Sequence, residues 1–250
     1  MTTINFLIAP DFPPEYFAGW HFLNTRLQRI TEKSIHLQMP AGSTEERQLI
    51  DSGGVDLIYA NPFDASRLIR ELNYLPLVRP ISHPNEMVIT ASAAQPYRTL
   101  EDLKPGMRVL LTENFDVKLI GLRLLESVDL NEENLQWTQL DTFQSVANQL
   151  IKGQAEIGFF LASAYHDLTQ FTRDQMTVLM ESKINDLSHV LLLHPKHQAQ
   201  QQEIAAAFLQ VSSDAAGKRI LEDLGLPNGF EILQQEDAEF MIDLMETLLD

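Results

Sequence analysis

The chain contains 250 residues, of which 18 are Lys or Arg and 35 are Asp or Glu, so its formal charge at neutral pH is −17. Hydrophobic residues make up 44% and charged residues 21%, which excludes a disordered or fibrous chain. The apolar runs are short, and none approaches the roughly 20 residues that a membrane-spanning helix requires, so we expect no membrane insertion. The acidity also argues against nucleic acid as a partner, because phosphate binding depends on clustered Lys and Arg.

Several classes of chemistry are missing from the sequence. There is no cysteine, which removes disulfides, thiolate metal sites and cysteine nucleophiles. The glycine-rich nucleotide-binding motifs and the zinc-protease and serine-hydrolase motifs do not occur, and Pro195 divides the pair His194 and His197. We therefore expect no metal site and no cofactor. Residues 1–5 do not begin a secretory signal peptide, so we expect a cytoplasmic protein, or a periplasmic one that has been processed.

Short apolar runs alternate with amphipathic stretches, and this pattern predicts an α/β fold. In the first part of the chain the predicted strands are 4–9, 35–39, 55–60, 75–78 and 86–91, and the predicted helices are 13–30, 44–51 and a helix that begins at Asn61-Pro62. Ser43 with Glu46 three residues later predicts a capping box, in which Ser43 is the N-cap. Gly53 then ends that helix.

The second part of the chain repeats this order of elements. Its predicted strands are 107–111, 135–140, 155–160, 176–180 and 187–193, and its predicted helices are 115–127, 142–152, 196–211, 214–224 and 236–249. Residues 48–59 and 149–159 both read as a helix end, a glycine, an acidic residue and a buried strand. This internal similarity predicts two lobes of similar topology.

Three segments carry a resemblance to a known family: 53–62, 99–109 and 224–230. They resemble the type 2 periplasmic solute-binding proteins, in particular the phosphate/phosphonate-binding branch of ABC importers, and the resemblance covers nearly the whole chain. It implies a two-lobed fold in which each lobe is a mostly parallel sheet flanked by helices. It also implies a ligand in the cleft between the lobes and closure by hinge bending.

The resemblance also implies domain boundaries. Lobe 1 would comprise residues 1–84 and 187–250, and lobe 2 would comprise residues 85–186. The hinges would lie where the chain crosses between the lobes, near 80–86 and 184–188.

Ligands of open α/β sheets bind beyond the carboxyl ends of the strands, where loops and helix N-termini meet. The loops that follow four of the predicted strands are 10–12, 61–63, 112–116 and 161–165. The expected ligand-binding residues are Asp11, Phe12, Asn61, Phe63, Thr112, Asn114, Phe115, Asp116, Ser163 and Tyr165.

The chain departs from the family at the position that binds phosphonate. The phosphonate binders carry Ser-Thr-Ser-Gly at a helix N-terminus of the second lobe, where this chain has residues 114–117, Asn-Phe-Asp-Val. Asp116 would repel a phosphonate, and Phe143 stands where the family has a histidine. Aromatic walls with Asp11, Glu113 or Asp116 as counter-charges favour an organic ligand that is partly apolar or cationic.

Other interpretations of these residues and of the whole chain remain open. Asp11 and Asp116 are equally compatible with helix N-caps, whereas Tyr59, Phe143 and the two tryptophans are expected in the core. The first functional hypothesis is a non-enzymatic solute-binding or sensor domain whose partner is an ABC importer permease or a regulatory protein. The alternatives are a biosynthetic enzyme on the same fold and a protein-interaction module with a vestigial cleft.

Overall fold

The computed structural model describes residues 3–12 and 14–249. The chain folds into two compact units. The first unit comprises residues 1–84 and 188–245, and the second comprises 85–187 and 246–250. The boundaries expected from the sequence differ from this division at Leu187 and at residues 246–250, which belong to the second unit.

The first unit is built on a six-stranded sheet in the order β11-β4-β10-β3-β1-β2. Its strands are β1 (Ile4–Ile8), β2 (Ile35–Gln38), β3 (Leu57–Ala60), β4 (Leu75–Pro80), β10 (Val190–Leu193) and β11 (Phe230–Ile232). Strands β2 and β3 pair with β1 in parallel, whereas β10 is antiparallel to β3 with Val190 opposite Ala60. The carboxyl ends of β1 and β3 and the amino end of β10 therefore lie at the same edge of the sheet.

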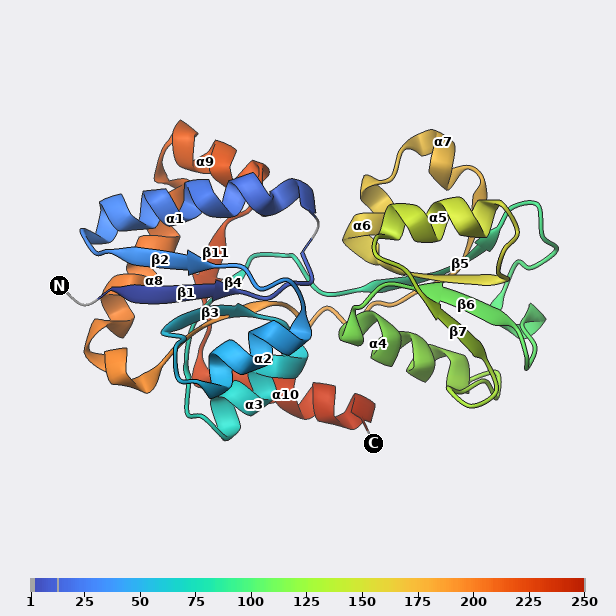
Figure 1. The fold of residues 1–250 in the computed structure, drawn as a ribbon, viewed down its shortest axis with the longest axis horizontal. Helices are drawn as coiled ribbons and strands as arrows, with labels where there is room; N and C mark the ends of the chain where they lie inside the picture. Colours follow the sequence, from blue (N-terminus) through green and yellow to red (C-terminus); the bar gives the residue numbers. More distant parts are fainter. Residues whose placement is uncertain (1–2, 13, 250) are drawn as a thin grey trace. The chain divides into compact units, whose positions relative to one another are not determined.

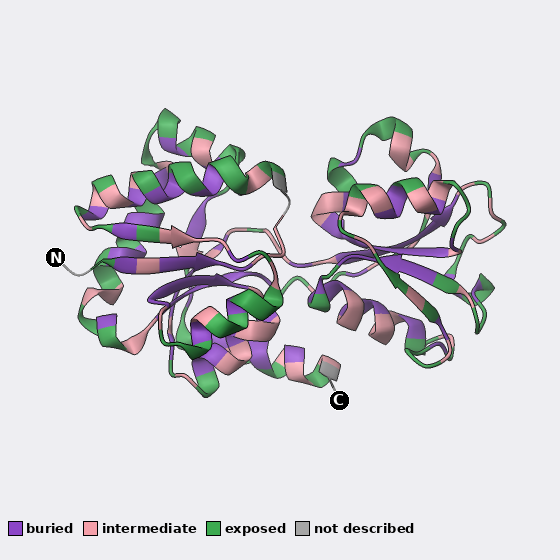
Figure 2. Cartoon of the chain, viewed as in Figure 1, coloured by how far each residue is buried: buried purple, intermediate pink, exposed green. Residues whose placement is uncertain are grey.

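Helices cover both faces of this sheet (Figure 1). On one face lie α1 (Phe17–Thr31), α8 (Gln201–Gln210) and α9 (Ala215–Glu222), and on the other lie α2 (Ser43–Asp51), α3 (Pro62–Arg70) and the part of α10 (Gln235–Leu249) that belongs to this unit. Trp20, Leu23 and Leu27 of α1 are buried because their spacing of three or four residues places them on one side of the helix. Figure 2 shows the result: buried strands under helices whose outer sides are exposed.

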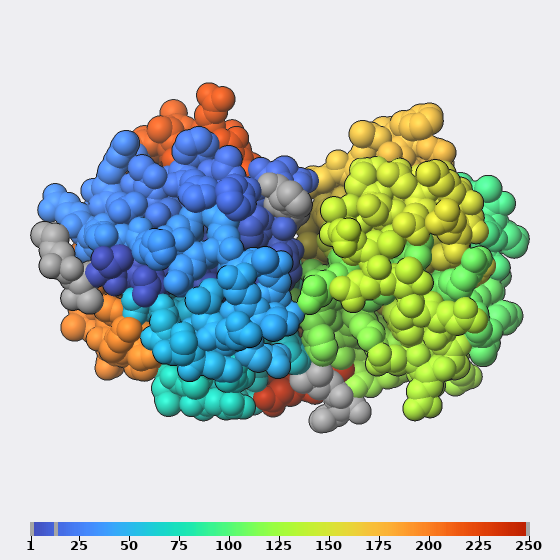
Figure 3. All heavy atoms as spheres, viewed as in Figure 1, coloured from blue at the N-terminus to red at the C-terminus, as the bar shows by residue number. Residues whose placement is uncertain are grey.

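The second unit has a five-stranded sheet in the order β7-β6-β8-β5-β9. Its strands are β5 (Met87–Ser92), β6 (Arg108–Leu111), β7 (Gln136–Gln139), β8 (Ile157–Leu161) and β9 (Met176–Glu181), and its helices are α4 (Phe115–Glu126), α5 (Phe143–Ile151), α6 (Ala162–Asp167) and α7 (Gln170–Arg173). Helix α4 lies on one face of the sheet and α5 to α7 lie on the other (Figure 1). In the space-filling view, the yellow-green segment that includes α5 covers much of the visible face of this unit (Figure 3).

The internal similarity seen in the sequence corresponds to a shared topology. Strands β2-β1-β3-β10-β4 of the first unit correspond in order to β7-β6-β8-β5-β9 of the second. In both units the fourth strand of this order is antiparallel to the third. The two glycines after α2 and α5, Gly53 and Gly153, both have a positive φ, 69° and 73°, which glycine adopts without strain.

Several predicted elements differ from the observed ones. Helix α2 begins at Ser43 and its N-cap is Gly42, which has no side chain, so the predicted capping box at Ser43 is wrong by one residue. Residues 162–165, predicted as a loop, belong to helix α6. The first helix begins at Phe17 after a short 3₁₀ turn, and the predicted start at Pro13 lies outside the described residues. Strand β11 has no counterpart among the predicted strands, because three residues are too few to show a period.

Candidate functional site

The side chains of Asp11 and His189 are hydrogen-bonded to each other at the carboxyl-end edge of the first sheet. Asp11 follows β1, and His189 immediately precedes β10. The Nε2 atom of His189 lies 3.1 Å from each carboxylate oxygen of Asp11, and both side chains are 10% exposed. Tyr59, in β3, stacks on the His189 ring with a centroid distance of 4.9 Å. Strand pairing thus brings together residues that are 178 positions apart in the sequence.

The surroundings of Asp11 determine its charge state. Burial would raise the pKa of Asp11, but the nearby His189 and hydrogen bonds, one of them from the Asn61 side chain, outweigh burial. The pKa of Asp11 therefore lies below its usual value. Asp11 is negatively charged at neutral pH and is not a helix N-cap, since α1 begins six residues later.

Asn61 links the end of β3 to α3. Its Oδ1 atom accepts a hydrogen bond from the backbone N–H of Asp64 at 2.8 Å, which is the N-cap interaction predicted from the Asn-Pro pair. Its Nδ2 atom lies 3.1 Å from Oδ2 of Asp64. Burial and the charge of Asp11 raise the pKa of Asp64. The α3 N-terminus thus places a second carboxyl group near Asp11.

Glu46 supplies a third carboxyl group to this edge, instead of the capping role that its spacing from Ser43 predicts. The residue is only 3% exposed, and its Oε1 atom has no hydrogen-bond partner among the residues that the structure describes. Burial, together with the charges of Asp64 and Asp11, raises the pKa of Glu46 to about 8. A signal was present in the sequence, because Glu46 and Ile50 are four residues apart and both lie on the buried side of α2.

The second unit presents amide and carboxyl groups at its own carboxyl-end edge. Asn114 is the N-cap of α4, and its side chain accepts a hydrogen bond from the N–H of Val117 at 3.0 Å. Asp116, in the first turn, is 5% exposed and accepts a hydrogen bond at 3.0 Å from Nδ2 of Asn85. The buried Thr112 precedes them after β6. A buried carboxylate and a capping amide therefore occupy the N-terminus of this helix.

The chain passes between the units near residues 84–85, 187–188 and 245–246, and the first two of these segments are hydrogen-bonded to each other. The N–H of Asn85 donates to the carbonyl oxygen of Leu187 at 2.6 Å. The Glu86 carboxylate accepts from the N–H of Asn185 at 2.6 Å and from the hydroxyl of Ser182. Asn185 has a positive φ of 65°. These two segments thus form one hydrogen-bonded pair rather than two independent linkers.

The aromatic and hydroxyl residues predicted to contact the ligand differ in how far they are buried. Phe12 is half-buried and packs edge-on against Trp20, with ring centroids 6.2 Å apart. Phe63 lies within the first turn of α3, and Phe115 is 50% exposed at the start of α4. In α6, Ser163 is half-buried and Tyr165 is buried against the core of the second unit.

The aromatic residues expected in the core are found packed against it. Tyr59 and Trp20 belong to the core of the first unit. In the second unit, Phe143 stacks on Phe160 at a centroid distance of 5.9 Å, and Trp137 packs edge-on against Phe159 at 5.7 Å.

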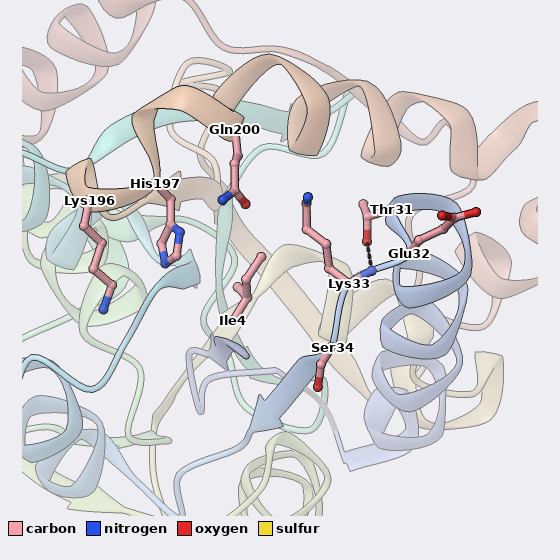
Figure 4. Close-up of a pocket in the computed structure, with 8 residues that line it drawn as sticks. All are labelled: Ile4, Thr31, Glu32, Lys33, Ser34, Lys196, His197 and Gln200. Carbon is pink, nitrogen blue, oxygen red and sulfur yellow. Dashed lines mark hydrogen bonds between the residues drawn. The ribbon is translucent and has the colours of Figure 1, made fainter. Parts of the chain in front are cut away.

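A hollow of about 590 Å³ lies at the opposite, amino-end edge of the first sheet (Figure 4). It is lined by the start of β1, by the turn between α1 and β2, and by the 3₁₀ turn Pro195–Gln200, from which Lys196, His197 and Gln200 project. Its lysines are already paired: Lys33 with Glu203 at 3.0 Å and Lys196 with the buried Asp56 at 2.5 Å. Since α/β proteins bind ligands at the carboxyl-end edge, we do not place the solute here.

Within residues 3–12 and 14–249, no three His, Asp or Glu side chains are arranged to hold a metal ion. None of the helices in those same ranges combines the length and the apolarity needed to cross a bilayer.

Two α/β units of similar topology are the architecture of a two-lobed solute-binding protein. Residues 6–238 match the family model of the ABC transporter phosphonate periplasmic substrate-binding proteins, and the chain belongs to this family. No curated protein matches the chain.

Solved structures with the same fold include phosphonate and sulfonate binders. PhnD1 from Prochlorococcus marinus, in complex with methylphosphonate, has a TM-score of 0.83 at 9% identity, with 99% of this chain and 98% of that chain covered. A binding protein component of an ABC phosphonate transporter from Pseudomonas aeruginosa has a TM-score of 0.81 at 14% identity, covering 99% and 86%. The aliphatic sulphonate binding protein SsuA from Escherichia coli has a TM-score of 0.68 at 16% identity, covering 99% and 92%.

Proposed function

We propose that this chain is a non-enzymatic solute-binding protein that presents a small organic ligand, other than a phosphonate, to the permease of an ABC importer. Membership of the substrate-binding family supports the binding role and the importer partner. We expect the ligand to contact residues at the carboxyl-end edges of the sheets, since open α/β sheets bind ligands there. The single observation that carries the choice of ligand is the buried Asp116 at the N-terminus of α4.

Asp116 changes what this helix N-terminus binds. A helix N-terminus normally attracts an anion through its free N–H groups and its dipole. Here the Asp116 carboxylate lies in the first turn, largely shielded from water, where its repulsion of a second anion is only weakly screened. Asn114 already uses its side-chain oxygen to cap the helix. A doubly charged phosphonate would therefore bind less well here than a neutral or cationic group.

Two of the crossing segments would act as the hinge. Residues 80–86 and 184–188 contain two of the three places where the chain passes between the units, and hydrogen bonds of Glu86 with Ser182 and Asn185 join these two segments. Because these two segments are joined, we expect them to bend together when a ligand shifts the balance between open and closed states.

Thermal unfolding in the presence of small solutes tests the proposed ligand class. The panel contains methylphosphonate, inorganic phosphate, methanesulfonate, and neutral and cationic organic solutes. A ligand at 100 times its dissociation constant adds about 2.7 kcal/mol to the free energy of unfolding. We expect organic solutes to raise the midpoint and methylphosphonate and phosphate to leave it unchanged. Mass spectrometry of each solute after incubation would show turnover if the protein were an enzyme.

A variant tests the role given to Asp116. Replacing Asp116→Ser removes the negative charge and introduces a hydroxyl, so methylphosphonate should stabilise the variant but not the wild-type protein. Glu133→Ser is the matched control, because Glu133 is exposed and lies in the segment before β7, away from the α4 N-terminus in sequence. Stabilisation of the wild-type protein by methylphosphonate, as strong as that of Asp116→Ser, would show that the ligand class is wrong.

A further inference from the structure

Three acidic side chains influence one another at the carboxyl-end edge of the first unit. They are Asp11, Glu46 and Asp64. His189 is paired with Asp11. Arg47 lowers the pKa of Glu46 and Asp64, and Arg67 lowers that of Asp64. Arg47 occupies an exposed position on α2, and Arg67 is already paired with Asp51 at 2.6 Å.

Glu46 differs from the other two acids because one of its buried carboxyl oxygens has no hydrogen-bond partner among the described residues. A buried carboxyl group normally has hydrogen-bond partners for its oxygens, because burial without them is unfavourable. Glu46 is only 3% exposed, yet its Oε1 atom finds no partner in the described part of the chain. Its side chain lies where Asp64, Asp11 and His189 all influence it. The orphaned oxygen therefore belongs to the acidic cluster and not to the helix cap.

The cluster excludes some ligands and favours others. An anion would be repelled by the Asp11 carboxylate and would leave the proton on Glu46 in place. A metal ion needs three or more ligands at short distance, and no such group occurs among residues 3–12 and 14–249. An ammonium or guanidinium group needs only hydrogen-bond acceptors and negative charge, and both are present.

We infer that this edge of the first unit binds the cationic group of an organic amine or guanidine, and that Glu46 exchanges its proton for that cation. The inference rests on the proposed solute-binding function and specifies the class of solute. Before binding, the Glu46 carboxyl group carries a proton. On binding, that proton leaves to water, the carboxylate forms an ion pair with the ammonium or guanidinium group, and the ligand keeps all of its own protons.

Proton exchange makes the affinity for a cation depend on pH. The groups that face Glu46 are Asp64 of α3, Asp11 after β1, His189 before β10 and its neighbour Arg47. Because the pKa of Glu46 is raised to about 8, the free protein holds the proton at pH 7. The cation must displace it, so the affinity should rise about tenfold for each pH unit between roughly 6 and 8 and level off above that range.

Calorimetric titration with matched pairs of probes tests the inference on the full chain. The pairs are L-arginine with L-citrulline, putrescine with 1,4-butanediol, and choline with 3,3-dimethyl-1-butanol, in which only the first member carries the additional positive charge. We expect at least one cation to bind at least tenfold more tightly than its matched partner. Titrations in buffers of different ionisation enthalpy should show nearly one proton released per cation at pH 7.

Variants identify the source of the proton. Glu46→Gln keeps the size of the side chain and removes the exchangeable proton, so proton release should disappear and cation affinity should fall about tenfold or more. Glu45→Gln is the control, since Glu45 is the exposed neighbour on the same helix. Circular dichroism confirms that each variant is folded.

The outcomes separate this inference from the function on which it rests. If neutral solutes or sulfonates bind and no cation is preferred, the chain is a solute-binding protein but the cation site is wrong. If cations bind with the same affinity and proton release in Glu46→Gln as in wild type, the role of Glu46 is wrong. If neither these probes nor the wider panel binds, both the cation site and the solute-binding function are overturned.

Discussion

Replacing Glu46→Gln should stabilise the first unit at neutral pH, although it removes a buried residue of a helix. In the folded protein the pKa of Glu46 is raised to about 8 from its ordinary 4.5. Below pH 4.5 the folded and unfolded chains both hold the proton. Between pH 4.5 and 8 the unfolded chain releases it while the folded chain retains it, so the contribution of Glu46 to stability is lost as pH rises through this range. Glutamine has no such proton to retain.

The size of this effect follows from proton linkage. Each pH unit in this window lowers the free energy of unfolding of the wild-type protein by about 1.4 kcal/mol relative to the variant. From about pH 5.5 to about pH 7.5 the difference between the two proteins should therefore change by about 2.5 kcal/mol, with Glu46→Gln gaining relative stability as pH rises. The range avoids the isoelectric point near 4.7, where the protein is least soluble.

The position of the two tryptophans makes the measurement specific to one unit. Trp20 lies in the core of the first unit and Trp137 lies in the second. In a Trp137→Phe background, urea unfolding followed by fluorescence therefore reports on the first unit alone. Glu45→Gln in the same background is the control. Parallel stability curves for Glu46→Gln and the control across this pH range would refute the assignment of a raised pKa to Glu46.

Two further changes probe packing and charge. Gly121→Ala should destabilise the second unit by about 1–3 kcal/mol, because the added Cβ would lie 2.2 Å from Cε2 of Phe159. Urea unfolding followed by Trp137 fluorescence in a Trp20→Phe background measures this effect, and an unchanged urea midpoint would contradict the packing. Asp56→Asn should destabilise the first unit by about 2 kcal/mol at pH 7, because Asp56 accepts the N–H of Asn5 at 2.9 Å and pairs with Lys196. These partners hold the pKa of Asp56 below its ordinary 3.8, although burial acts in the opposite direction. The wild-type protein should therefore be more stable than Asp56→Asn above about pH 4, and this difference in stability should disappear in acid. A difference that does not depend on pH would contradict the ion pair.

Much of the fold was predictable because it depends on local patterns. The alternation of apolar runs with amphipathic stretches placed most strands and helices within one or two residues of their observed bounds. The Asn61-Pro62 pair predicted a helix start because an N-cap side chain needs only the N–H groups of the next turn. Gly53 and Gly153 marked helix ends for a similar reason, since a positive φ is a property of one residue.

The candidate site was predicted less completely, because its residues come from distant parts of the chain. The loops after β1, β3 and β6 were correctly placed at strand ends, and Asp11 was named, but its partner His189 and the neighbouring Glu46 were missed. In the second unit Asp116 was named and its donor Asn85 was not. No local pattern identifies such partners, because sheet pairing alone determines which strand ends share an edge.

The sequence by itself determined the α/β class, the internal similarity of the two halves and the caps of several helices, all of which depend on residues within a few positions of one another. Only the tertiary structure decided the charge states at the first edge. On an exposed helix turn the Glu46 carboxyl group would be an ordinary ionised acid. Because α2 packs it near Asp64 and Asp11, it instead holds its proton at neutral pH. The physical reason is that desolvation and Coulomb forces depend on distance in space, which the order of residues along the chain does not specify.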